Sequence, residues 1–216
     1  YVRTHWNFRL LAKQIARNGA HVLRFDYHGI GDSAGRIQQV DSLEVWLNNV
    51  NASIEHLKGE SGAETVMLLG QRFGGFLAGQ TALVRPDVNS IVLWEPILRG
   101  ATYLQELRRM HAEMIDLWVC KIETTNDSNH EEILGSVYCR SLIEQIETAE
   151  LDLSKIIPPQ LIVELADNEL AVSAQDPSMQ KVIYDERPSS WADLHALESA
   201  YLRPKITQRI VKLVKE

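Results

Sequence analysis

The chain has 216 residues, of which 45% are hydrophobic and 24% charged, so it is long enough for one domain with a sizeable core. Its 22 basic and 29 acidic side chains give a net charge of −7, which argues against a nucleic-acid surface. No apolar run reaches the roughly 18–20 residues of a membrane span. Two cysteines and no secretory leader favour the cytoplasm. Because the chain opens at Tyr1 without a methionine, we expect that it starts inside a longer protein.

Predicted helices and strands alternate through the first hundred residues. Apolar spacing and turn signals predict a helix over 8–16, a strand over 21–25, a loop rich in Gly and Asp over 26–33 and a helix over 40–58. A buried strand over 66–69, a helix over 74–84 and a second buried strand over 90–94 follow. This alternation is typical of an α/β fold with a mostly parallel sheet flanked by helices.

Residues 101–155 have helical periodicity and no convincing strand. They carry 11 acidic and 5 basic side chains, a net charge of −6 that accounts for nearly all of the chain's −7. We interpret them as a helical cap inserted into a core formed by residues 1–100 and 156–216. The apolar stripe from Leu104 to Trp118 is best explained by packing on the sheet edge, although it could also shape a ligand pocket or form a homodimer. Strands over 160–165 and 181–184 and a closing helix over 205–215 complete the prediction.

The segment from Leu68 to Gly75 carries the main functional signal. A strand, a tight turn and a helix with the spacing G-x-S-x-G form the nucleophile elbow of α/β hydrolases, which exposes a strained serine at a helix N-terminus. Gly70 and Gly74 occupy the two glycine positions, but Arg72 stands where the serine would be. A guanidinium stays protonated and cannot attack a carbonyl.

Together with this turn, three other stretches carry a family resemblance: Tyr1-Val2-Arg3, the loop Asp26-Tyr27-His28-Gly29-Ile30-Gly31-Asp32-Ser33 with its preceding strand, and Leu93-Trp94-Glu95-Pro96 with Gly100 and Tyr103-Leu104. The chain resembles the α/β hydrolases, and most resembles the exosortase-associated hydrolases of bacterial surface-polysaccharide clusters, which are akin to serine aminopeptidase-like hydrolases. The resemblance implies an α/β-hydrolase fold and acyl chemistry on ester, thioester or amide bonds. It also implies that early strands and an oxyanion-hole amide precede Tyr1.

The family's catalytic triad runs in the order nucleophile, acid, histidine. The resemblance places the acid at Asp167, with Glu169 as a substitute. The loop after Tyr184, where the histidine should lie, contains none, and His195 is the only histidine further along the chain. With Arg72 in the serine position, we do not expect ordinary serine-hydrolase chemistry.

Three readings of Arg72 remain open. It could pair with Asp167 or Glu169 and fill an inactive pocket, it could bind an anionic ligand together with the Phe73 amide, or it could face solvent or a partner protein. Glu95 is either a second partner for Arg72 or a solvated loop carboxylate. Beside them, Gln71 is either a pocket-lining amide or a packed linker.

The remaining candidates favour neither a metal site nor a cofactor. The seven histidines are scattered, Cys120 and Cys139 fit buried apolar positions, and no phosphate-binding glycine motif is present. The sequence therefore predicts a hydrolase-like pseudoenzyme that binds a small acidic or acyl ligand, or a partner protein, at the elbow. Arg99, Arg108 and Arg109 could make the pocket under the acidic cap locally positive. The alternative is an active hydrolase or acyltransferase.

Overall fold

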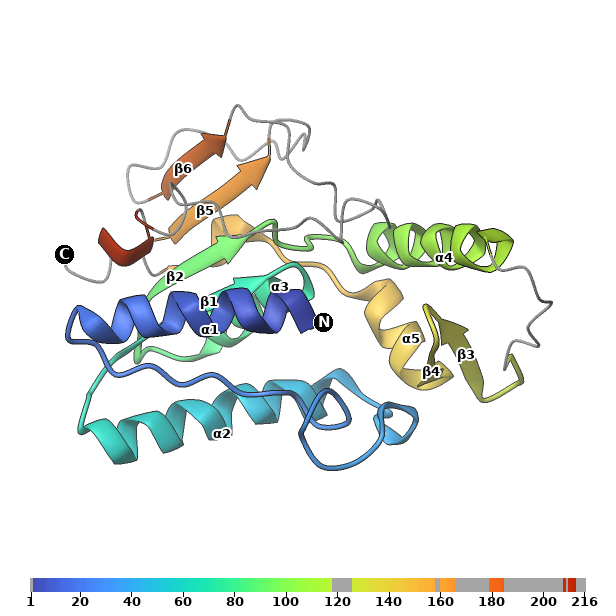
Figure 1. Cartoon of the computed structure of the whole chain (residues 1–216), viewed down its shortest axis with the longest axis horizontal. Helices are drawn as coiled ribbons and strands as arrows, with labels where there is room; N and C mark the ends of the chain where they lie inside the picture. The colour runs from blue at the N-terminus through green and yellow to red at the C-terminus, as the bar shows by residue number, and fades with distance from the viewer. Residues whose placement is uncertain are drawn as a thin grey trace.

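The computed structural model describes residues 2–117, 126–157, 160–165, 179–184, 208 and 210–212 (Figure 1). Four parallel strands form the main sheet in the order β1-β2-β5-β6. They are β1 (Val66–Gln71), β2 (Val88–Trp94), β5 (Gln160–Leu165) and β6 (Met179–Tyr184). The predicted α/β architecture with a parallel sheet is therefore confirmed.

Helices cover both faces of this sheet because β2 is apolar on both sides. Ile91 and Leu93 face the cluster built on α2 (Leu43–Ser61) and α3 (Phe73–Val84), whereas Val92 and Trp94 pack with α1 (Val2–Arg17) and Ile210. Alternate residues of a strand point to opposite faces, so one apolar run serves both clusters. The described residues 208 and 210–212 are helical, and the rest of the predicted closing helix lies outside the described residues.

The predicted strand over 21–25 is wrong. A cavity of about 400 Å³ lies beside β1, and its lining includes residues 19–25, residues 65–69 and side chains of α1 and α2. The hydrogen bonds of a sheet require neighbouring strands about 4.8 Å apart. Because the cavity lies beside β1, residues 21–25 do not pair with β1 and form no strand. Phe25 is 39% exposed as a result.

The loop over 26–33 is built as predicted, with glycines at its turns. Gly29 has a φ of 79°, and a Cβ there would stand 2.8 Å from the backbone nitrogen of Ile37. Ser33 Oγ donates to the Asp26 carbonyl at 2.5 Å, and the Asp32 amide donates to the Asp26 carboxylate at 3.1 Å. These side chains serve the shape of the loop.

The segment between β2 and β5 contains α4 (Gly100–Leu117), the strands β3 (His130–Ile133) and β4 (Ser136–Cys139), and α5 (Arg140–Thr148). The absence of strands predicted here is wrong, because β3 and β4 form an antiparallel hairpin. Its two-residue turn puts Leu134 at φ 52° and Gly135 at φ 76°. Such turns favour Asn-Gly or Asp-Gly, so a leucine in the first position conceals the hairpin in the sequence.

Both ends of this segment are joined to each other. The Gly100 amide donates to the Ala149 carbonyl and the Leu151 amide to the Leu98 carbonyl, each at 2.9 Å. Figure 1 shows α4, α5 and the hairpin gathered on one side of the sheet. Among the described residues, no helix has the length and apolar character needed to cross a membrane.

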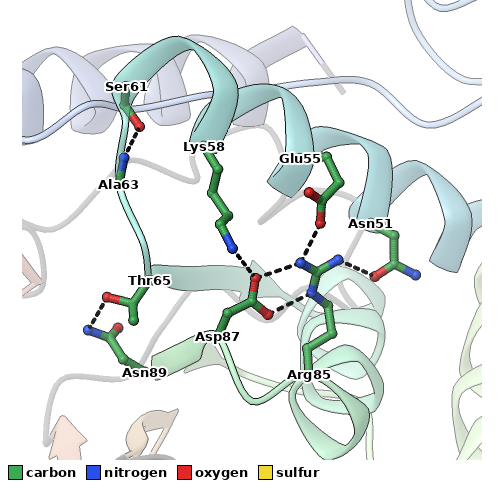
Figure 2. Close-up of polar contacts among 9 residues, drawn as sticks. All are labelled: Asn51, Glu55, Lys58, Ser61, Ala63, Thr65, Arg85, Asp87 and Asn89. Atoms are coloured by element: carbon green, nitrogen blue, oxygen red, sulfur yellow. Dashed lines mark hydrogen bonds and ion pairs between the residues drawn. The ribbon is translucent and has the colours of Figure 1, made fainter.

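A charged network fastens α2 to the turn between α3 and β2 (Figure 2). Asp87 accepts from Lys58 at 2.7 Å and from Arg85 at 2.6 Å, and Arg85 also reaches Glu55 at 2.5 Å and Asn51 at 3.4 Å. The guanidinium therefore joins two elements that are 30 residues apart in the chain.

Candidate functional site

The turn between β1 and α3 is a strained elbow. Arg72 lies between the last residue of β1 and the first of α3, with φ 51° and ψ −122°. Its amide donates to the Trp94 carbonyl at 2.9 Å, and its carbonyl accepts from Gly75 at 2.9 Å and from Ile97 at 3.2 Å. Such a conformation costs of order 1–3 kcal/mol in a residue other than glycine. The strand, tight turn and helix expected over 68–75 are present, and the residue at the tip of the turn has a positive φ.

The first glycine of the motif, Gly70, is needed because the backbone folds tightly on itself. A Cβ on Gly70 would stand 2.3 Å from the Gly74 carbonyl oxygen, and one on Gly75 would stand 3.2 Å from the Gly70 carbonyl oxygen. Gly70 is therefore a packing requirement of the elbow, whereas a Cβ on Gly74 would meet only the Tyr27 hydroxyl, at 4.0 Å.

The Arg72 side chain reaches toward α4. Its Nη2 lies 2.5 Å from Oε2 of Glu106, and both side chains are 22% exposed. Its Cζ stands 5.9 Å from the centre of the Tyr103 ring. A cation at a helix N-terminus opposes the helix dipole, and the Glu106 carboxylate offsets that cost.

A row of aromatic rings runs from the loop over 26–33, across the elbow, to α4. The ring centres of Tyr27 and Trp46 are 6.1 Å apart, those of Trp46 and Phe73 are 5.9 Å apart, and those of Phe73 and Tyr103 are 5.4 Å apart. The indole nitrogen of Trp46 donates to the His28 carbonyl at 3.1 Å, which fixes the middle of the row. Four elements thus contribute to one aromatic wall.

A cavity of about 190 Å³ adjoins this wall between the core and α4, α5 and β3. Its aromatic lining residues are Tyr27, Trp46, Phe73, Tyr103 and Tyr138, and aliphatic side chains complete it. Burial raises the pKa of Tyr27 to about 12 and raises the pKa of Tyr103 well above its usual value. Both phenols are therefore neutral donors at physiological pH.

The chain matches the family model of serine aminopeptidase S33 over residues 1–183. It belongs to this family. Similar solved structures include a protein of Agrobacterium vitis S4, which is 19% identical, with a TM-score of 0.59 and coverage of 99% of this chain and 81% of that one. No curated protein sequence matches significantly.

Two enzymes with solved structures are also similar. A metagenome-derived lipolytic enzyme is 13% identical, with a TM-score of 0.62 over 97% of this chain and 87% of its own. An esterase of Pyrococcus furiosus is 12% identical, with a TM-score of 0.61 over 97% of this chain and 74% of its own. At such identities the likeness concerns the α/β-hydrolase fold.

Three of the residues predicted for this hydrolase-fold site, Asp167, Glu169 and His195, lie outside the described residues, so their roles stay predictions. Arg72 has a carboxylate partner, Glu106, that the sequence did not suggest. Glu95 follows β2 with a φ of 46° and is 3% exposed, so the expectation of a solvated loop carboxylate is wrong, because the residue is buried.

The structure also describes the two neighbours of Arg72 and the other candidate residues. Gln71 ends β1, half-buried and in register with Trp94, and Phe73 belongs to the aromatic row. The arginines expected to make the pocket positive are largely neutralised: Arg108 pairs with Glu131 and Glu147, and Arg109 pairs with Glu113. Arg99 is exposed, and Cys139 is a half-buried free thiol.

Sequence reasoning missed Glu106, although a signal existed. Tyr103 and Glu106 are three residues apart on α4, a spacing that places two side chains on neighbouring positions of one helix surface. The apolar stripe of α4 indicates only which face of the helix is buried. It does not indicate a contact with Arg72, which lies 34 residues away from Glu106 in the chain.

Proposed function

We propose that this protein is a non-catalytic member of its family that binds a small ligand, acyl or acidic, in the cavity beside Arg72. The observation that carries the proposal is the ion pair of Arg72 with Glu106 at 2.5 Å at the tip of the elbow. An elbow nucleophile must offer a lone pair to the substrate, whereas the guanidinium is a protonated donor held by a carboxylate.

The cavity favours a small ligand over a partner protein. It lies beside the elbow, between α2 and α3 on one side and α4, α5 and the β3–β4 hairpin on the other, and its walls are aromatic and aliphatic. Enclosed, mostly apolar cavities with a few polar groups suit small molecules, which bury most of their surface there. The strained backbone at Arg72 supports a functional role for this turn, because such strain persists where the surrounding structure imposes it.

The test combines a fluorophosphonate probe with hydrolysis of p-nitrophenyl butyrate, applied to the wild-type protein and to Arg72→Ala. We expect no labelled serine and no hydrolysis above the uncatalysed rate in either protein. Labelling of one serine in the wild type, with ester hydrolysis that disappears when that serine is replaced by alanine, would overturn the proposal.

The second candidate is an active hydrolase or acyltransferase on ester, thioester or amide bonds, linked to surface-polysaccharide biosynthesis. Its support is that similar solved structures include a lipolytic enzyme and an esterase. This candidate requires wild-type turnover that depends on Asp167 or His195. Hydrolysis lost in both Asp167→Asn and His195→Ala, with thermal stability unchanged, would favour it over the binding protein.

A further inference from the structure

The size of the elbow cavity limits what it can hold. Its volume is about 190 Å³. Since an apolar cavity of about 150 Å³ holds benzene, this cavity accommodates one aromatic ring with a small substituent, or a short acyl chain. The stacked rings of Phe73 and Tyr103, with centres 5.4 Å apart and 13° between planes, both line the cavity and offer apolar ring atoms to such a group.

The polar groups at the cavity are neutral donors. Among the described residues, no charged side chain lines it, and neither the Tyr27 nor the Tyr103 hydroxyl has a hydrogen-bond partner there. The Tyr27 hydroxyl lies 4.0 Å from the point where a Cβ on Gly74 would stand, so this donor is beside the first turn of α3. A carbonyl oxygen is the acceptor that such phenols suit.

The positive charge of Arg72 beside this wall is already compensated. Arg72 stands 5.9 Å from the Tyr103 ring, and its guanidinium is neutralised by Glu106, which comes from the same turn of α4 as Tyr103. An anionic ligand that displaced the Glu106 carboxylate would break its ion pair with Arg72. An anionic ligand that lay beside Glu106 would be repelled by the like charge.

We propose that Glu106 is a specificity-determining residue, which makes the elbow cavity select neutral carbonyl compounds with a small aromatic or acyl body over carboxylates of the same shape. This inference rests on the proposed function and narrows its ligand class. It also explains how a pocket next to an arginine can avoid recruiting the many small anions of a cell.

The experiment uses benzamide and benzoate. Both have about nine non-hydrogen atoms and the same shape, but benzamide is neutral and benzoate is negatively charged. Dissociation constants are measured by NMR titration of the whole chain at pH 7. We expect the wild type to bind benzamide more tightly. Glu106→Gln frees the charge of Arg72, and the benzamide-to-benzoate preference should move toward benzoate by about tenfold. Arg72→Met leaves the Glu106 carboxylate alone and should move the preference the other way.

The matched control is Glu113→Gln, which removes the same charge from the same helix at an exposed pair with Arg109. It should leave the preference within about twofold of wild type. A wild-type preference for benzoate, or equal shifts for both ligands in Glu106→Gln, would overturn the role of Glu106 while the binding function stands. Absence of binding by both probes to all four proteins would overturn the cavity as a binding site, and with it the proposed function.

Discussion

The two ends of α3 each carry an arginine, and the two arginines stand in opposite circumstances. Arg72 precedes the first turn with a φ of 51°, where its charge opposes the helix dipole, and one carboxylate compensates it. Arg85 follows the last turn with a φ of −113°, where the dipole favours a cation, and it pairs with Asp87 and Glu55. The same residue type is thus easily accommodated at one end and costly at the other.

The contrast separates an arginine that its surroundings favour from one that they oppose. At Arg85, the backbone conformation, the dipole and the ion pairs of Figure 2 all favour the arginine. At Arg72, the backbone is strained and the dipole is unfavourable, and within the described part of the chain the side chain is favoured by Glu106 and the Tyr103 ring. Local rules are broken mainly where a protein needs a particular chemistry, so this strain agrees with the binding site proposed at the N-terminal end of α3.

The largest effect should come from closing the elbow sterically. Gly70→Ala would put a Cβ 2.3 Å from the Gly74 carbonyl oxygen, a backbone atom that cannot turn away. We expect the free energy of unfolding, measured by urea denaturation, to fall by about 3 kcal/mol or more. The control is Gly59→Ala inside α2, where no atom lies within 4 Å and the substitution should stabilise the helix by about 0.5–1 kcal/mol. Equal effects of the two substitutions would contradict the tight elbow.

At the other end of α3, Asp87→Asn should lower the free energy of unfolding by about 2 kcal/mol. Asp87 is 19% exposed and accepts from both Lys58 and Arg85, so its loss leaves two cations without their shared carboxylate. Asp116→Asn, at an exposed position of α4, is the control and should change stability by less than about 0.5 kcal/mol. An equal effect at both positions would mean that the network of Figure 2 contributes little.

The contribution of Asp87 should also depend on pH. Hydrogen bonds from Arg85, and then from Lys58, hold the pKa of this carboxyl well below its usual value. Because the pKa is lower in the folded state, the stabilisation is complete above the unfolded pKa of about 3.9 and decreases as the pH falls below it. The stability difference between wild type and Asp87→Asn should therefore be constant from pH 7 to pH 5 and shrink toward pH 2. A difference that grows on acidification would contradict this sign.

The sequence predicted the elements whose structure depends on local pattern. The parallel strands and the glycine spacing of the elbow follow from apolar runs and turn chemistry, which a single segment contains. The prediction of a strand over 21–25 is wrong because a strand also needs a hydrogen-bonded neighbour. The cavity beside β1 leaves this segment outside the sheet. The hairpin was missed because Leu134 adopts a φ of 52° that leucine rarely takes. Glu106 was missed because only the folded chain brings it to Arg72.

The smallest effect is also the sharpest test of the contrast between the two ends of α3. Arg72→Gly and Arg72→Ala both remove the ion pair, but only glycine relieves the strain at φ 51°. We expect Arg72→Gly to be more stable than Arg72→Ala by about 1 kcal/mol in urea denaturation. At Arg85 the φ of −113° suits any residue, so the order should reverse, with Arg85→Gly less stable than Arg85→Ala by up to about 1 kcal/mol. If Arg72→Ala were instead more stable than Arg72→Gly, Arg72 would not be strained, and the backbone would no longer support the proposed function at this position.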